Sequence, residues 1–437
     1  MNQLFKPLAY HSLVPVPLRS RSLHISRTLA GVTVATYPEP GLTAGLSVIV
    51  GGGPRYETEG TAGAAHFLKN YTFMNNQKRK ALRIVREAEL TSAILSRTLT
   101  HEYLSAQVQF LKGDEDYFSE ILSDVICRQT YEPHEFPQVH ERTKWQTQDA
   151  KRHINVEGLE KAHQLAFRNG LGNPLFSSHQ DLVDHVKVRM FAKTIFTSSN
   201  IVVVGRGVDH KALLGYVHLY FDLNDPEQIK HPSTYYGGDV RTMNTNQNAH
   251  CTMAFRGFSS GSSAYYASKV LQEVLGGGNH LKWTTEQCKL AAVKSQISNE
   301  SEITSFSIGY SDIGLFGLQL NTPNHDMGKA VKLTMDALAT LKTHITDDEM
   351  QRAKNIAKMN FMNIAQSRLD SMDFVGFSIL NGNTGNFEDI LGSIDNVQKQ
   401  DLHKVASDIL SSKPTSVTIG NLHSIPYLDQ YFGGNTT

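Results

Sequence analysis

The sequence predicts an α+β protein with two homologous domains, each a mixed, mostly antiparallel sheet covered by helices on one face. Three observations predict this class. The chain has 437 residues, too long for one ordinary core. Strand patterns and helical stripes alternate without a regular βαβ rhythm, which favours antiparallel or mixed sheets. Their order repeats once at a spacing above 200 positions, which indicates two homologous domains rather than a solenoid.

The first half opens with two strand patterns and two helices. The stretch GVTVATYPEPGLTAGLSVIV, residues 31–50, predicts a β-hairpin whose turn is the Pro-Glu-Pro-Gly segment. Helices are expected at roughly 61–76 and 79–90. In EYLSAQVQF, residues 102–110, apolar and polar side chains alternate, and this period of two predicts a strand with one buried face.

A helix and a strand complete the first half. Asp114 is expected to cap the helix, because a short acidic side chain can accept bonds from the first backbone N–H groups. Its apolar positions form a single stripe: Phe118, Ile121, Leu122 and Val125. NIVVVGRG, from Asn200, is a continuous apolar run and predicts a buried strand.

The second half repeats this order. HCTMAF from His250 answers GLSVIV from Gly45, and SVTIGN from Ser416 answers IVVVGR from Ile201. GLFGLQL leads to Asn324, the expected cap of a second striped helix. The stripe is Met327, Val331, Leu338 and Leu341.

A polar segment rich in Pro and Gly separates the halves. FDLNDPEQIKHPSTYYGGD begins at Phe221 and has the composition of a linker. We therefore expect an N-terminal domain at 31–220, a linker at 221–238 and a C-terminal domain at 239–437.

Residues 1–38 contain no Asp or Glu and carry Lys6, Arg19, Arg21 and Arg27. Acid-poor segments with Arg and Ser are typical of mitochondrial presequences, so residues 1–30 are predicted to be one. The alternative is a disordered basic tail. RSLHISRTLA, residues 21–30, resembles a two-step matrix-cleavage pattern, which would start the mature chain near Gly31.

Composition argues against several functions. The 42 Lys and Arg balance the 42 Asp and Glu, which does not suggest a nucleic-acid-binding protein. No apolar run approaches the roughly 18 residues of a membrane-spanning helix, so membrane association is expected only through partners. Cys127, Cys251 and Cys288 are far apart and fit no zinc, iron–sulfur or haem spacing, so no cofactor is predicted.

One helical segment, HFLKN, is an incomplete zinc motif. In His-x-x-Glu-His, both histidines share one helix face and the Glu takes a proton from zinc-bound water. Here His66 is present, but Lys69 stands at the position of the base, where an ammonium cannot accept a proton. Asn70 is a poor zinc ligand. The sequence therefore predicts no metal and no catalytic residue, and His66 is read as a core histidine with satisfied hydrogen bonds.

The segment GTAGAAHFLKN is similar to the zinc-binding segment of the pitrilysin-type metallopeptidases, the family of the mitochondrial processing peptidase. Further stretches follow that family in order, over roughly residues 31–432. They include AFRNGLGNPLF, NIVVVGRGVDH, YYGGDVR, VLGGGNHLKW, YSDIGLFG and IPYLDQYF. The resemblance implies the pitrilysin-like fold.

In catalytic members of that family, the resemblance implies a third zinc ligand, a Glu, later in the chain than the motif. The corresponding stretch here is HERTKWQTQDA, with Trp145, Gln146, Thr147 and Gln148 around the expected position. Glu141 or Asp149 could replace it after a small shift. Either would restore only a second ligand and not the base.

The family has two non-catalytic classes. They are the core subunits of the ubiquinol–cytochrome c reductase (cytochrome bc1) complex and the alpha subunit of the processing peptidase, which presents a long glycine-rich loop. GGGNHLKWTT, residues 276–285, is short, and REAEL, FRNGLGNPL and IPYLD resemble the core subunit 2 branch of fungal reductases most closely.

The core-subunit resemblance implies a chain that performs no chemistry. It implies pairing with core subunit 1 and other subunits in a dimeric complex, on the matrix side of the mitochondrial inner membrane. A processing-peptidase alpha subunit, or a peptidase whose site a partner completes, stays an alternative.

Overall fold

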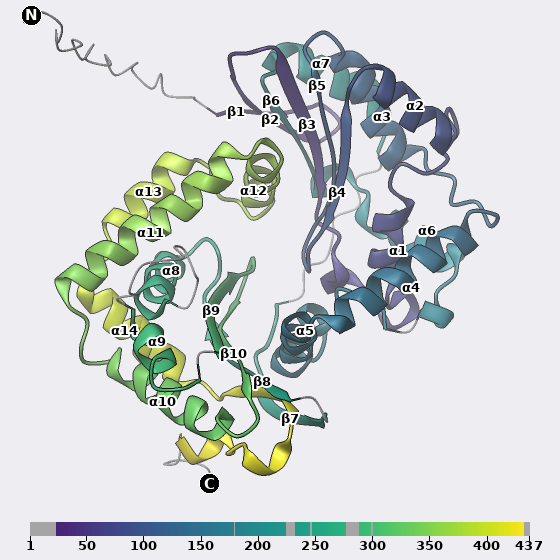
Figure 1. The fold of residues 1–437 in the computed structure, drawn as a ribbon. Coiled ribbons are helices and arrows are strands. Elements are labelled where there is room, and N and C mark those ends of the chain that lie inside the picture. Colours follow the sequence, from purple (N-terminus) through teal and green to yellow (C-terminus); the bar gives the residue numbers. More distant parts are fainter. Residues whose placement is uncertain are drawn as a thin grey trace, which may run out of the picture.

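A computed structural model of the chain describes residues 23–178, 180–223, 232–244, 247–276, 288–298 and 300–431, which form two sheets with their helices (Figure 1). Residues 1–22 of the predicted leader and residues 277–285 of the glycine-rich segment lie outside this description. Two domains of α+β class, as predicted, are therefore present.

The first sheet has the order β1-β2-β6-β3-β5-β4. Its strands are β1 (His24–Arg27), β2 (Thr33–Tyr37), β3 (Thr43–Val50), β4 (Ile94–Leu99), β5 (Leu104–Leu111) and β6 (Ile201–Arg206). The predicted hairpin over residues 31–50 is wrong, because β6 lies between β2 and β3. All six residues of β6 are buried, and a central place between two neighbours pairs both of its edges.

The second sheet repeats the first. Its order is β7-β11-β8-β10-β9. The strands are β7 (Gly238–Met243), β8 (Asn248–Gly257), β9 (Glu302–Gly309), β10 (Gly314–Pro323) and β11 (Thr415–Gly420). β7 and β11 are parallel, as are β2 and β6, and the other neighbours in this sheet are antiparallel. The predicted internal repeat is confirmed.

The helices of the first half are α1 (Ala64–Tyr71), α2 (Ala81–Leu90), α3 (Glu115–Cys127), α4 (Phe136–Arg152), α5 (Ile154–Phe167), α6 (His185–Ile195) and α7 (His210–Tyr220). Three of them, α1 to α3, lie close to predicted positions, and α4 to α7 add four that were not predicted from the sequence. α1 is shorter than expected, and Phe73, just beyond its end, has a positive φ of 65°. Asp114 precedes α3, but its side chain makes no capping bond, so this part of the prediction is wrong.

The second half contributes α8 (Ser263–Leu275), α9 (Lys289–Lys294), α10 (Met327–Thr340), α11 (Asp347–Gln366), α12 (Arg368–Leu380), α13 (Phe387–Asp395) and α14 (Lys399–Ser411). The stripe of α10 is buried as predicted. Its N-cap residue is Asp326 and not Asn324, whose side-chain oxygen instead accepts from the backbone N–H of Asn421. Within the described ranges, every helix is too short or too polar to cross a bilayer.

The two halves exchange helices. α12 from the second half packs against β3 and β6, and α5 from the first half packs against β8 and β11 (Figure 1). Met372 and Val375 of α12 thus join a buried cluster with Ile49 and Val204. A helix of the other half thus packs on the second face of each sheet, and the prediction that helices cover only one face is wrong.

The polar face of β5 is an example of a sheet face that a helix of the other half covers. Ser105 and Gln107, expected on an open face, are buried beneath α12. Their side chains donate to the carboxylate of Asp373 at 2.9 and 2.6 Å, and Ser47 of β3 donates to it at 3.1 Å. The polar residues of β5 are therefore internal hydrogen-bond donors to the other half.

Candidate functional site

His66 lies on the inner face of α1 and is only 2% exposed. The backbone N–H of Ser177 donates to its Nδ1 at 3.3 Å, so Nε2 carries the ring proton and donates to Gln146 Oε1 at 2.8 Å. Burial lowers the pKa of His66 to about 4, opposed by the Gln146 bond and reinforced by Lys69. At neutral pH His66 is therefore uncharged with both ring nitrogens hydrogen-bonded.

Gln146 on α4 lies in the stretch where the resemblance leads us to expect a third ligand, and it contacts His66. Its Oε1 also accepts from Asn70 Nδ2 at 3.0 Å, and the same Nδ2 is 2.9 Å from Thr143 Oγ1. Of the candidates in this stretch, Gln146 contacts His66. Glu141 is exposed and Asp149 is half-buried. His66, Asn70 and Gln146 thus come together in space as an imidazole and two carboxamides.

Positive charge adjoins this group. Lys69 is partly buried, and burial followed by the charge of Arg97 lowers its pKa. Arg97 donates from Nη1 to the backbone carbonyls of Thr72 at 2.9 Å and Asn70 at 3.3 Å. Two cations beside a neutral cluster disfavour a divalent metal ion. Among the described residues, no three His, Cys, Asp or Glu side chains are grouped so as to hold one.

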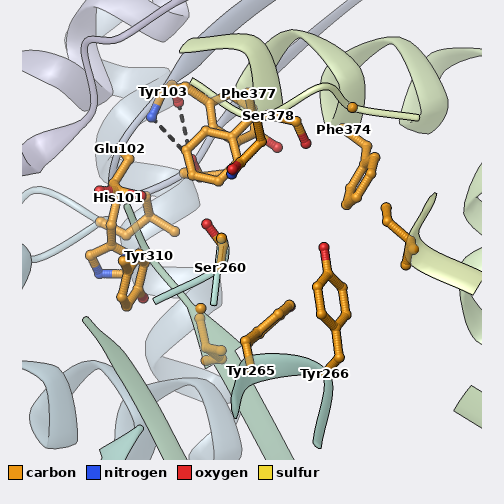
Figure 2. A pocket seen from close by; sticks show the side chains of 18 of the residues that line it. His101, Glu102, Tyr103, Ser260, Tyr265, Tyr266, Tyr310, Phe374, Phe377 and Ser378 are labelled. Carbon is orange, nitrogen blue, oxygen red and sulfur yellow. Dashed lines mark hydrogen bonds between the residues drawn. The ribbon is translucent and has the colours of Figure 1, made fainter. Parts of the chain in front are cut away.

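A cavity of about 830 Å³ opens near this cluster, between the two halves. Aromatic side chains form much of its wall: Tyr103 from the first half and Tyr265, Tyr266, Phe374 and Phe377 from the second. Figure 2 shows the Tyr266 hydroxyl and Ser260 directed into the space between these walls. The volume and lining suit an apolar molecule of moderate size.

Two stacked histidines, His101 and His163, line one end of this cavity, and Figure 2 labels His101. The rings of His101 and His163 are 4.5 Å apart, and His163 Nε2 lies 2.7 Å from the hydroxyl of Tyr310. Burial lowers the pKa of His101 well below its usual range and that of His163 to about 4. It raises the pKa of Glu160, 3.8 Å from His101, to about 7. No local sequence pattern predicts this group, because its members come from separate segments.

An ionic cluster joins the halves beside the histidines. Arg55 lies in the short helix η1 (Pro54–Tyr56) and contacts Glu102 at 2.5 Å and Asp312 at 2.7 Å. Glu102 also accepts from the hydroxyl of Ser311 at 2.6 Å. Because Asp312 and Ser311 belong to the β9–β10 turn, this cluster fixes the second half against the first.

The three cysteines are free thiols. Cys251 is buried, and Cys127 and Cys288 are half-buried. Burial raises the pKa of the Cys251 thiol to about 12 and that of Cys127 to about 11, so both stay protonated at neutral pH.

Family models match both halves of the chain. Residues 32–179 match the model described as "Insulinase (Peptidase family M16)". Residues 183–357 match "Peptidase M16 inactive domain".

Curated relatives match over nearly the full length. "Cytochrome b-c1 complex subunit 2, mitochondrial" of Cryptococcus neoformans is 31% identical, over 98% of this chain and 99% of that protein. The proteins of the same name from Neurospora crassa and Homo sapiens are 30% and 24% identical, and the matches cover 92% and 95% of this chain and 89% and 93% of theirs.

Among solved structures, a chain of "Complex III2 from Candida albicans, Inz-5 bound" has the same fold, with a TM-score of 0.83 and 16% identity. The match covers 94% of this chain and 99% of that one. The chain therefore belongs to the insulinase family of peptidases, on the branch of the mitochondrial cytochrome b-c1 complex subunit 2 proteins.

Proposed function

We propose that the chain is a non-catalytic structural core subunit of the mitochondrial cytochrome b-c1 complex, the ubiquinol–cytochrome c reductase. It supports assembly and stability of the complex that transfers electrons from ubiquinol to cytochrome c. The names of the relatives support the assignment. The observation that carries the non-catalytic part is the hydrogen-bonded set of His66, Asn70 and Gln146, which takes the place of a zinc site.

In this role the chain supplies surface rather than chemistry. Its direct partner is core subunit 1, and both belong to a dimeric complex with further subunits. An obligate interface of this kind buries on the order of 2,000–5,000 Å² in total. The chain lies on the matrix side of the inner membrane and is held there by its partners. Its loss would destabilise partner subunits by mass action and would not slow a chemical step directly.

The proposal includes the organisation expected from the sequence. Residues 31–220 and 239–437 form two peptidase-like domains joined by the linker 221–238. A basic leader within residues 1–30 directs import into mitochondria.

Purification of the tagged chain from mitochondria tests this assignment. We expect haem-containing partners in the visible spectrum and core subunit 1 by mass spectrometry. The purified assembly should contain no zinc that depends on His66. It should also show no cleavage of a fluorogenic peptide that depends on His66. A soluble two-chain peptidase without haem would instead identify a processing-peptidase alpha subunit, and zinc lost on His66→Ala would identify a peptidase completed by a partner.

A further inference from the structure

The first sheet begins before the predicted cleavage position. β1 pairs with β2 in an antiparallel register from His24↔Thr36 to Arg27↔Thr33. These residues lie inside the segment 1–30 that the sequence pattern assigns to the leader. Cleavage near Gly31 would therefore remove a whole strand from the folded chain.

Side chains hold β1 in place from α7. His210 Nε2 lies 2.8 Å from Ser26 Oγ on β1, and its Nδ1 lies 2.9 Å from Thr36 Oγ1 on β2. One imidazole thus connects both strands. Without β1, His210 Nε2 would lose its contact with Ser26, and the imidazole would no longer connect the two strands.

The turn between β1 and β2 is also ordered by specific bonds. The backbone N–H of Thr28 donates to the carbonyl of Val32 at 2.9 Å, and Arg27 Nε donates to the carbonyl of Gly31 at 2.7 Å. Gly31 has φ of +92°, a conformation that favours glycine. The residues on both sides of the predicted scissile bond belong to one closed hairpin.

The internal repeat provides a reference for a sheet without this strand. In the part of the chain that the structure describes, β7, the counterpart of β2, is the edge strand of its sheet, and none of its six residues is buried. In β2 the three central residues, Val34, Ala35 and Thr36, are at most 1% exposed. β2 is therefore buried like an interior strand, because β1 covers its outer edge. Without β1, β2 would become the edge strand and would expose backbone groups and apolar side chains.

The contacts extend back to Leu23. Its side chain packs against the buried cluster that contains Met372 and Val375 of α12. The segment from Leu23 onward thus joins the sheet of the first half and also contacts the helix donated by the second.

We infer that the mature chain keeps Leu23 and all that follows, and that the leader is removed at a peptide bond on the N-terminal side of Leu23. A presequence peptidase would hydrolyse one bond there with one water molecule, giving a free carboxylate on the leader and a new amine on the mature chain. This rests on the leader assigned in the proposed function, and it moves the processing site away from Gly31.

Mass spectrometry of the intact chain purified from mitochondria, with chemical labelling of its N-terminus, tests the inference. We expect a single N-terminus between residues 3 and 23. An N-terminus anywhere from His24 to Thr33 would overturn it, and so would a chain that starts at Met1 or Asn2. Co-purification of haem-containing partners is scored separately, so an error in the processing site is distinguishable from an error in the proposed function.

A deletion variant adds a second readout. Joining residues 1–22 directly to Gly31 keeps the leader but removes β1. We expect import to continue, while the steady-state amount of assembled chain falls at least several-fold. Ile25→Ala is the matched control, because it keeps the backbone pairing and changes a side chain that is 46% exposed. Equal amounts of deletion variant and control would contradict a structural need for β1.

Discussion

At the level of single residues, we expect Gln146 to decide whether a zinc site can be built around His66. Lys69→Glu with Asn70→His creates the helical part of the motif but leaves the carboxamide of Gln146 beside His66, where we expect a third ligand to stand. Zinc sites of this type need three protein ligands. We expect the double variant to bind no zinc at equimolar concentration, measured as metal content after gel filtration.

Adding Gln146→Glu to that double variant completes the ligand set, and we expect zinc to co-elute with it. The matched control adds Gln148→Glu instead, which makes the same change at an exposed position of the same helix. Zinc in the double variant or in the control would show that Gln146 does not occupy the third-ligand position.

The ionisation of Glu160 makes the free energy of unfolding depend on pH. Burial raises its pKa from 4.5 to about 7, while the backbone bonds of Leu175 and Phe176 oppose the rise. In the unfolded chain this carboxyl ionises first, so its contribution to stability is complete below about pH 4.5 and is lost as the pH rises through about 7. We expect Glu160→Gln to unfold at a higher urea concentration than wild type at pH 8 and at a similar one at pH 5.

The control for that series is Glu141→Gln, which removes an exposed carboxyl from the neighbouring helix α4. Its unfolding curve should follow wild type at both pH values. Parallel behaviour of wild type and Glu160→Gln from pH 5 to pH 8 would mean that Glu160 titrates normally.

The degenerate motif could be predicted from the sequence because its positions are local. His66, Lys69 and Asn70 lie within five consecutive residues, so helix geometry alone relates them. Gln146 could be placed only within a four-residue stretch by resemblance. The stacked pair His101 and His163, with Tyr310 of the other half, follows from long-range packing that no local pattern encodes.

At the level of elements, two predictions failed for the same reason. The hairpin over residues 31–50 and the single buried face of β5 were both inferred from neighbours in sequence. In the folded chain β6 enters between β2 and β3, and α12 covers the polar face of β5. The alternation in β5 was read correctly as a strand, but a polar face can also be buried when another element supplies its acceptor.

The contact of α12 with the first sheet depends on a small residue at Gly376. A Cβ at that position would lie 2.7 Å from Cγ1 and 3.1 Å from Cβ of the fully buried Ile49. We expect Gly376→Ala to push α12 off the sheet and destabilise the chain by roughly 1–3 kcal/mol, measured by urea unfolding.

Gly392→Ala on α13 is the matched control, because a Cβ there meets nothing within 4 Å. The same substitution in this open helical position should stabilise the chain by roughly 0.5–1 kcal/mol, through the higher helix propensity of alanine. Opposite signs for the two variants distinguish a steric contact from a general effect of alanine. A neutral Gly376→Ala would contradict the tight packing of α12.

At the level of the whole molecule, the exchange of α5 and α12 makes each half part of the other's core. The face of the first sheet that carries Ile49 and Val204 is buried by Met372 and Val375. The face of the second sheet that carries Ala254 and Val417 is buried by Ala162 and Ala166. We therefore expect the two homologous domains to unfold as one cooperative unit, which suits a subunit whose role is to present a fixed surface.

This exchange predicts that neither half folds alone. A chain ending at residue 223 would lack α12 and expose the buried Ser105 and Gln107 without their acceptor Asp373, and a chain starting at residue 232 would lack α5. We expect each fragment to be insoluble or to show no cooperative unfolding when expressed singly. Expressed together, they should recover a soluble complex, because both exchanged helices are then present.

Asp373→Ala in the second fragment should weaken that complex, because buried donors left unpaired each cost roughly 1–3 kcal/mol. Asp370→Ala, at an exposed site of α12, is the matched control and should not weaken it. A single fragment that unfolds cooperatively at the temperature of the intact chain would show that the exchanged helices are dispensable for the fold.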